Sequence, residues 1–300
     1  MAVDPIILGH NQFIGVSHLS QDAARSRVER FSEMGRVGEL VRFCVESGVR
    51  GMMLSTHPRA RDILDYLKAE GLADELTFYP LVPYAQGYVR RMNAVGMRGM
   101  VREIFSEAPL GTKADIAWKG SVGYLRKDFT RLLGAFTDIE MLTFRGFRVG
   151  AVFLHDAFVD LALALGAGEQ VRYFAEHVEK RHGAPPAFVT MNFPLLVDSF
   201  ERWGISRPLV MTTFNKAGFQ MNPSREACEE ALGRDRADVV AMSTLAAGYL
   251  KPREAYEYLA SLPGIRSVAV GVSTPEHARE TFDLISEKMG FARRPGAEGA

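Results

Sequence analysis

The chain has few cysteines, no excess charge of either sign and no long hydrophobic run. Each of these absences excludes a class of protein. Two cysteines among 300 residues are too few for a disulfide framework or a thiolate metal site. Lys plus Arg and Asp plus Glu both number 36, so no basic surplus points to nucleic acid. No apolar run approaches the ~20 residues that span a bilayer. We therefore expect no nucleic-acid partner and no membrane partner.

The N-terminal sequence also lacks the pattern of a secretory signal. Its first residues, MAVDPIILGHN, contain no basic region followed by an apolar core. Few cysteines suit a reducing compartment. Together these features lead us to expect a cytoplasmic protein.

The clearest local pattern lies in residues 239–284, where strand, loop and helix follow one another twice. Apolar runs at 239–242 and 267–272 lack the alternation of a half-exposed strand, which indicates strands buried on both faces, as in parallel sheets. The second loop ends at Thr274, a good helix N-cap, followed by Pro275 at the first helical position and Glu276 in the first turn. This is the βα unit twice over.

The same unit recurs along the chain. Strand patterns followed by helical sequence lie at residues 6–9, 51–54, 76–82, 147–154, 187–191, 209–213, 239–242 and 267–272. Eight such units in a chain of this size predict an α/β fold, a (β/α)8 TIM barrel. We expect one domain over residues 1–290 and a flexible tail at 291–300. A doubly wound open sheet is the alternative, but no Gly-x-Gly-x-x-Gly follows a strand and no P-loop pattern is present.

One long segment between the third and fourth predicted strands carries no strand pattern. Residues 85–145 show helical patterns near 88–105 and 124–136. We predict a helical insertion between strands 3 and 4. Such a segment could cover a site, pair with another subunit in a homo-oligomer, or only add packing helices.

Histidines fall where predicted strands end, which is where TIM barrels build their active sites. Three of the seven histidines, His10, His57 and His155, occupy such positions, and Asp156 follows His155. Imidazole exchanges protons near neutral pH, so we favour His155 as an acid/base group, with Asp156, His10 and His57 assisting. The alternative is a helix start, with Asp156 as its N-cap.

Other polar residues at strand ends could bind a small polar substrate. The predicted set is Asn11, Gln12, Tyr84, Asn192, Asn215 and Lys216. The amides could equally cap helices and loops, and Tyr84 could be rim packing. Lys216 could form a Schiff base with a carbonyl or be an ordinary surface lysine.

A divalent metal is a further alternative for the histidines. His10, His57 and His155 with Asp156 have ligand types that suit zinc, manganese or iron. The chain contains neither His-x-His nor His-Glu-x-x-His, so we assign no metal ligand from the sequence.

Three segments resemble the aldo-keto reductase superfamily. Residues 243–250 (STLAAGYL) resemble its motif after strand 7, residues 270–277 (VGVSTPEH) its eighth strand and cofactor-side helix start, and residues 153–156 (FLHD) its Gln-x-His segment. The resemblance implies that His155 is the catalytic histidine and that NADP(H) is the cofactor. The residues it places at the cofactor are Asn192, Ser273, Thr274, Arg279 and Glu280.

The chain departs from that superfamily in its proton relay. The exits of predicted strands 2 and 3 read LSTH (54–57) and VPY (82–84), without the family's Asp, Tyr and Lys. We therefore predict an aldo-keto-reductase-like barrel enzyme that acts on a small polar carbonyl or hydroxyl compound, with oxidoreductase chemistry as one form. The alternatives are a metal- or lysine-assisted lyase, isomerase or epimerase, and a non-catalytic small-molecule-binding barrel.

Overall fold

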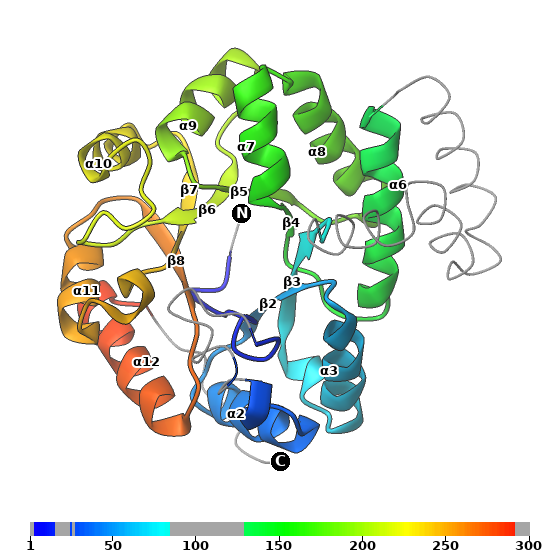
Figure 1. The fold of residues 1–300 in the computed structure, drawn as a ribbon, viewed down its shortest axis with the longest axis vertical. Coiled ribbons are helices and arrows are strands. Elements are labelled where there is room, and N and C mark those ends of the chain that lie inside the picture. The colour runs from blue at the N-terminus through cyan, green and yellow to red at the C-terminus, as the bar shows by residue number, and fades with distance from the viewer. Residues whose placement is uncertain (1–2, 16–24, 26–27, 85–128, 292–300) are drawn as a thin grey trace.

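The computed structural model describes residues 3–15, 25, 28–84 and 129–291, and within them eight parallel strands form a closed barrel. Each strand pairs with its neighbours in sequence, and β8 pairs with β1 (Figure 1). The strands are β1 (Ile6–Leu8), β2 (Gly51–Ser55), β3 (Thr77–Val82), β4 (Val152–Leu154), β5 (Pro186–Thr190), β6 (Leu209–Thr213), β7 (Asp238–Met242) and β8 (Ile265–Val270). The predicted (β/α)8 barrel is confirmed.

Helices surround the barrel as an outer ring (Figure 1). They are α2 (Met34–Glu46), α3 (Pro58–Ala69), α6 (Phe129–Met141), α7 (Asp156–Leu165), α8 (Gly168–His182), α9 (Phe193–Arg202), α10 (Arg225–Gly233), α11 (Pro252–Ala260) and α12 (Pro275–Met289). Short 3-10 turns occupy Ala73–Glu75, Leu142–Phe144 and Ala246–Gly248. Across the described residues, no helix is both long and apolar enough to cross a bilayer.

Helix α6 belongs to the segment predicted as a helical insertion. It packs against α8 and touches β3, so this part of the insertion joins the outer ring. The remainder of the insertion, residues 85–128, lies outside the described residues, as does the tail at 292–300.

The fourth strand is shorter than its apolar pattern predicts. The sequence predicts residues 147–154, but β4 spans only Val152–Leu154, preceded by an isolated bridge between Phe78 and Val149. The Phe147 ring instead packs edge-on against the Phe78 ring, 5.4 Å between centroids. An apolar run can fill a core without joining the ladder, and periodicity does not separate the two.

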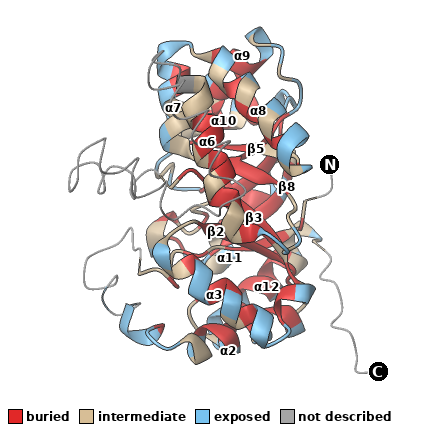
Figure 2. Ribbon diagram, turned by 90° about the vertical axis from the view of Figure 1, so that its right-hand side faces the viewer, coloured by how far each residue is buried: buried red, intermediate tan, exposed pale blue. Residues whose placement is uncertain are grey.

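The core has two layers separated by the sheet. Inside the barrel lie Ile7, Met53, Tyr79, Ala151, Phe153, Ala187, Val189, Leu209, Met211 and Val240, while a larger layer packs between strands and helices. Figure 2 shows the buried strands at the centre and exposed faces on the outer helices. A filled interior is a packed core rather than a channel, so a ligand site has to lie at an end of the barrel.

Candidate functional site

Three histidines from distant parts of the sequence come together at the C-terminal end of the barrel. His10 lies just beyond β1, His57 follows β2 and begins α3, and His155 follows β4 and begins α7. The charges of His57 and His155 both act on the His10 imidazole. The structure therefore brings together three of the four predicted catalytic residues, and Asp156 adjoins the third.

His10 is held in its neutral form. Burial lowers the pKa of His10 from 6.5 to about 4, and repulsion from His57 and from His155 adds to the effect. Its residue surface is only 7% exposed. A neutral imidazole in a dry site can donate a hydrogen bond to a substrate oxygen without carrying a charge.

His155 and Asp156 form a close pair at the start of α7. The Nδ1 atom of His155 lies 2.7 Å from Oδ1 of Asp156. Burial opposes ionisation of Asp156, but the hydrogen bond and charge of His155, together with backbone N–H groups, hold the pKa of Asp156 below its usual value. A carboxylate at this distance favours a proton on Nδ1, which leaves Nε2 as the basic nitrogen.

The pair also begins a helix, as the alternative interpretation predicted, but the capping residue differs. His155, not Asp156, is the N-cap of α7, because its Nδ1 accepts from the Ala157 N–H at 3.2 Å. That contact requires a lone pair on Nδ1, whereas the shorter contact with Asp156 requires a proton there. We take the 2.7 Å contact as the dominant one since a charge-assisted hydrogen bond is the stronger of the two.

His57 caps α3 in the same way and lies beside Tyr84. Its Nδ1 accepts from the Arg59 N–H at 3.2 Å, with Pro58 at the first helical position. The His57 and Tyr84 rings meet edge to face, 5.6 Å between centroids. The cap places a proton on Nε2 of His57, so that nitrogen is a donor in the neutral ring.

Glu140 of α6 reaches the same end of the barrel, and the sequence did not reveal it. It is a buried carboxylate that accepts from the Thr56 hydroxyl at 2.5 Å and from the Tyr84 N–H at 2.9 and 3.0 Å. It therefore ties α6 to the exits of β2 and β3. The helical pattern predicted at 124–136 ends before Glu140, and nothing in the sequence placed that helix against the barrel.

Asp160, also missed, organises the exit of β5 around Asn192. Its carboxylate accepts from the Thr190 hydroxyl at 2.5 Å and from the Met191 N–H at 3.0 Å. Burial, aided by the charge of Asp156, raises the pKa of Asp160 against these hydrogen bonds. The Asn192 N–H donates to Thr190 Oγ1, and Asn192 Oδ1 accepts from the Leu195 N–H as the cap of α9.

The other predicted substrate-binding residues have local partners. Gln12 is buried and donates to the Gly9 carbonyl at 2.6 Å, and Asn11 lies beside it in the loop after β1. Asn215 is fully buried, and both polar atoms of its amide bind backbone groups in the loops after β6 and β7. The Lys216 ammonium lies 2.7 Å from Glu254 in a half-exposed ion pair. These contacts account for Asn215 and Lys216 as loop and surface groups.

Four of the five residues that the resemblance places at a dinucleotide lie around the start of α12, and the fifth, Asn192, caps α9 instead. Thr274 caps that helix, and its hydroxyl and the backbone N–H of Glu276 hold the pKa of the Glu276 carboxyl below its usual value. Arg30 donates to the Ser273 carbonyl at 3.2 Å, and the exposed Arg279 guanidinium lies 5.5 Å from the centre of the Phe43 ring.

A nucleotide phosphate needs the free N–H groups of a helix start. At α12, Glu276 places a negative charge in the first turn, which repels a phosphate, and Glu280 is exposed on the same helix. In this arrangement the residues do not fit the phosphates of NADP(H).

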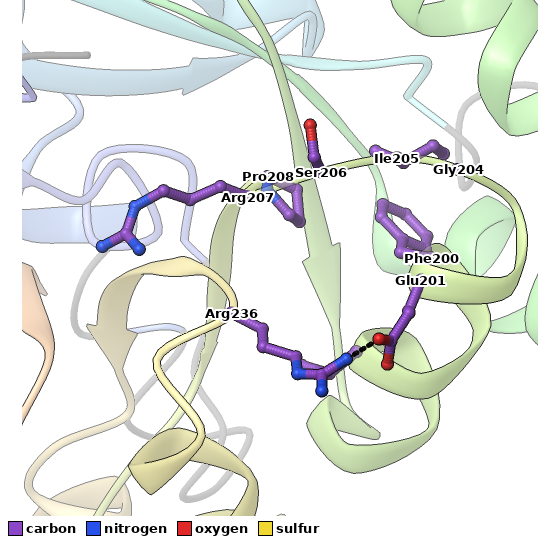
Figure 3. A pocket seen from close by; sticks show the side chains of 9 residues that line it. Phe200, Glu201, Gly204, Ile205, Ser206, Arg207, Pro208 and Arg236 are labelled. Carbon is purple, nitrogen blue, oxygen red and sulfur yellow. Dashed lines mark ion pairs between the residues drawn. The ribbon is translucent and has the colours of Figure 1, made fainter.

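A separate surface pocket of about 350 Å³ lies at the opposite end of the barrel. Figure 3 shows its wall, with Arg236 paired to Glu201 and with Pro208 immediately before β6. It is lined by Val197, Phe200, Glu201, Gly204, Ile205, Ser206, Arg207, Pro208 and Arg236. Because it borders the N-terminal end of β6, this pocket lies at the opposite end of the barrel from His10, His57 and His155.

No family model matches the sequence, and no curated protein matches it either. Solved structures do match, over nearly the whole chain. Two structures of Pseudomonas aeruginosa proteins assigned to the aldo-keto reductases are 16% and 14% identical, with TM-scores of 0.56 and 0.59, over 96% of this chain and 92% of theirs. A protein assigned as a 2,5-diketo-D-gluconic acid reductase B is 11% identical, with a TM-score of 0.54, over 99% of this chain and 90% of its own.

The chain shares the barrel fold of these proteins. At these identities the likeness establishes the barrel and its connectivity and leaves the chemistry to the residues. On this fold, His155 lies beyond β4, as the sequence resemblance implies. The exits of β2 and β3 carry His57 and Tyr84.

Proposed function

We propose that this protein is an enzyme that moves protons on a small polar substrate carrying a carbonyl next to a hydroxyl-bearing carbon. The observation that carries the proposal is the His155–Asp156 pair, 2.7 Å apart, near a buried neutral His10 at the active end of the barrel. Two groups with opposed preferences for a proton are the usual signature of acid/base chemistry.

His155 is the acid/base group in this proposal. With Nδ1 paired to Asp156, Nε2 takes a proton from the carbon next to the carbonyl, and the C–H electrons form the C=C bond of an enediolate. The imidazolium that results is stabilised by Asp156. Return of the proton to the other face of the same carbon gives an epimer. Return to the neighbouring carbon gives an isomer, provided that the hydroxyl proton passes from its oxygen to the former carbonyl oxygen. Neither reaction needs an added oxidant.

His10 and His57 supply the electrophilic side. The carbonyl oxygen gains negative charge as the proton leaves, and a fixed N–H donor stabilises that charge most where water is excluded. The buried, neutral His10 meets this requirement, and Nε2 of His57 is a second donor because Nδ1 is occupied by the helix cap. In this proposal Asn192, which Thr190 and Leu195 hold in position, orients the substrate hydroxyl.

The test is hydrogen–deuterium exchange into short hydroxy-ketones and hydroxy-aldehydes, followed by NMR in D2O. The wild-type protein is expected to exchange the proton next to the carbonyl of at least one compound. His155→Gln should slow this about 10²- to 10⁴-fold, the usual contribution of a general base. Asp156→Asn should also slow the exchange, because the imidazolium formed at His155 loses its carboxylate partner.

His277→Gln is the matched control, since His277 is an exposed histidine on α12 and has no role in the proposed reaction. It should exchange substrate at the wild-type rate. An unchanged exchange rate in His155→Gln would show that His155 is not the acid/base group. Tight substrate binding without exchange would favour a non-catalytic binding barrel.

Hydride transfer is a second candidate, favoured by the full-length fold likeness to proteins assigned as reductases. It is tested on the same samples by following NADPH and NADH consumption with the same carbonyl compounds. Consumption that depends on His155 would establish the reductase. The position of Glu276 leads us to expect weak binding of NADPH, and Glu276→Gln should tighten it if a phosphate reaches the start of α12.

A further inference from the structure

A second cluster of metal-ligand side chains lies away from the barrel's active end, between α6 and α8. Asp138 comes from the last turns of α6, and His177 and His182 come from the C-terminal half of α8. The Nε2 atoms of His177 and His182 lie 2.7 and 2.9 Å from the same oxygen, Oδ1 of Asp138. One potential donor atom from each residue lies within 4.8 Å of the other two.

We propose that Asp138, His177 and His182 bind a divalent transition metal, with zinc as the best match. Two imidazoles and one carboxylate are a common set of three protein ligands for zinc, and a water completes the tetrahedron. In a tetrahedral zinc site with bonds of 2.0–2.2 Å, donor atoms lie roughly 3.3 Å apart. Small outward shifts of both rings from Asp138 therefore open the space that the ion needs.

Charge is the second argument for a cation. The Asp138 side chain is only 4% exposed, and its Oδ1 atom contacts both imidazoles. A cation close to a buried carboxylate stabilises its ionised form. A metal ion held by both imidazoles would place two positive charges beside Asp138.

The two rings are already ordered for this role. The Tyr173 ring stacks on His177, 5.5 Å between centroids and 15° between planes, and the His177 and His182 rings meet edge to face at 5.9 Å. Both histidine side chains are at most 15% exposed. Because Glu140 lies two positions after Asp138, a metal here would also fix the helix that carries Glu140 to the barrel's active end.

The experiment measures zinc and cobalt binding by the full chain after treatment with a chelator. One zinc per chain is expected, together with a rise in Tm and, with Co2+, the visible absorption of a tetrahedral site. His177→Asn, His182→Asn and Asp138→Asn should each weaken zinc binding by at least about 10-fold, since each removes a ligand. His155→Asn and His277→Asn should bind as the wild type does.

Wild-type protein that takes up no zinc and shows no Tm shift would overturn the proposal without any variant. Binding that survives in all three cluster variants but is lost in His155→Asn would also overturn it, because the metal would then lie among the barrel-end histidines. His182 is the last residue of α8, so His182→Asn should keep the fold and the native circular dichroism spectrum. Its zinc affinity is therefore the decisive measurement.

Discussion

His10 is an imidazole that folding keeps neutral, and this makes the protein's stability depend on pH. Its pKa in the folded chain is about 4, against 6.5 for an ordinary histidine. The unfolded chain therefore binds the proton more readily, and stability falls as pH drops from about 6.5 toward 4. At pH 5 the expected loss relative to pH 7 is about 2 kcal/mol, from 1.36 kcal/mol per pH unit.

Urea unfolding of wild-type protein and His10→Gln at pH 5 and pH 7 checks this. The amide of Gln does not titrate, so the variant should lose less stability on acidification. His277→Gln, changed at an exposed histidine, should behave as the wild type does. An equal pH dependence in wild type and His10→Gln would show that His10 is not held neutral by the fold.

Single residues also mark the limit of what the sequence predicts about the site. His10, His57 and His155 could be placed at the barrel's active end because each directly follows a strand, and parallel strands end on one side. Glu140, Asp160 and Asp138 could not, because their positions depend on how α6 and α7 are seated against the barrel. Asn215 ends a strand as His155 does, yet its amide closes a loop.

Close packing of α8 and α9 depends on the absence of a side chain at Gly168. A Cβ atom there would meet three ring atoms of Trp203 at 2.5–2.7 Å. Gly168→Ala should therefore destabilise the protein by about 1–3 kcal/mol, the usual cost of overpacking.

Gly233→Ala is the matched control, because Gly233 also lies in a helix and a Cβ there meets nothing within 4 Å. It should be neutral or slightly stabilising, since alanine favours helix. Chemical denaturation of both variants measures the difference. Equal stability of the two variants would mean that Trp203 moves aside without cost.

Elements were predictable where their patterns were local. The start of α12 was predicted from Thr274, Pro275 and Glu276, and the helix begins at Pro275. The shortened β4 was not predictable, because Phe147 and Val149 are apolar for a helix-facing core as well as for a strand. Helix α6 was expected as part of an insertion. Its position beside α8 could not be predicted, because that position depends on tertiary packing.

At the scale of the whole molecule, the barrel's N-terminal end is tied together through Asp4. The Tyr79 hydroxyl donates to Asp4 Oδ2 at 2.7 Å and accepts from the Asp4 N–H at 3.0 Å, and the Ser267 hydroxyl donates to the Asp4 carbonyl at 2.6 Å. These bonds join the segment before β1 to β3 and β8.

Tyr79→Phe should lower the free energy of unfolding by about 1–3 kcal/mol, because Asp4 is buried and would lose a partner for its carboxylate. The midpoint of urea unfolding should fall while the m-value stays constant. Tyr249→Phe removes a hydroxyl from a residue that is 82% exposed and should leave the midpoint unchanged. A midpoint unaffected by Tyr79→Phe would show that Asp4 finds water or another partner.

Closure of the barrel through β1 and β8 has a consequence for synthesis on the ribosome. β1 can pair with β2 early, but its other edge waits for β8, where Ile6 meets Val268. At translation rates of about 5–20 residues per second, that edge stays open for tens of seconds. An open strand edge is a template for association with other chains. Nascent copies of this protein can therefore associate through the free edge of β1 until nearly the whole chain has emerged. With only three residues, β1 offers a short template during that interval.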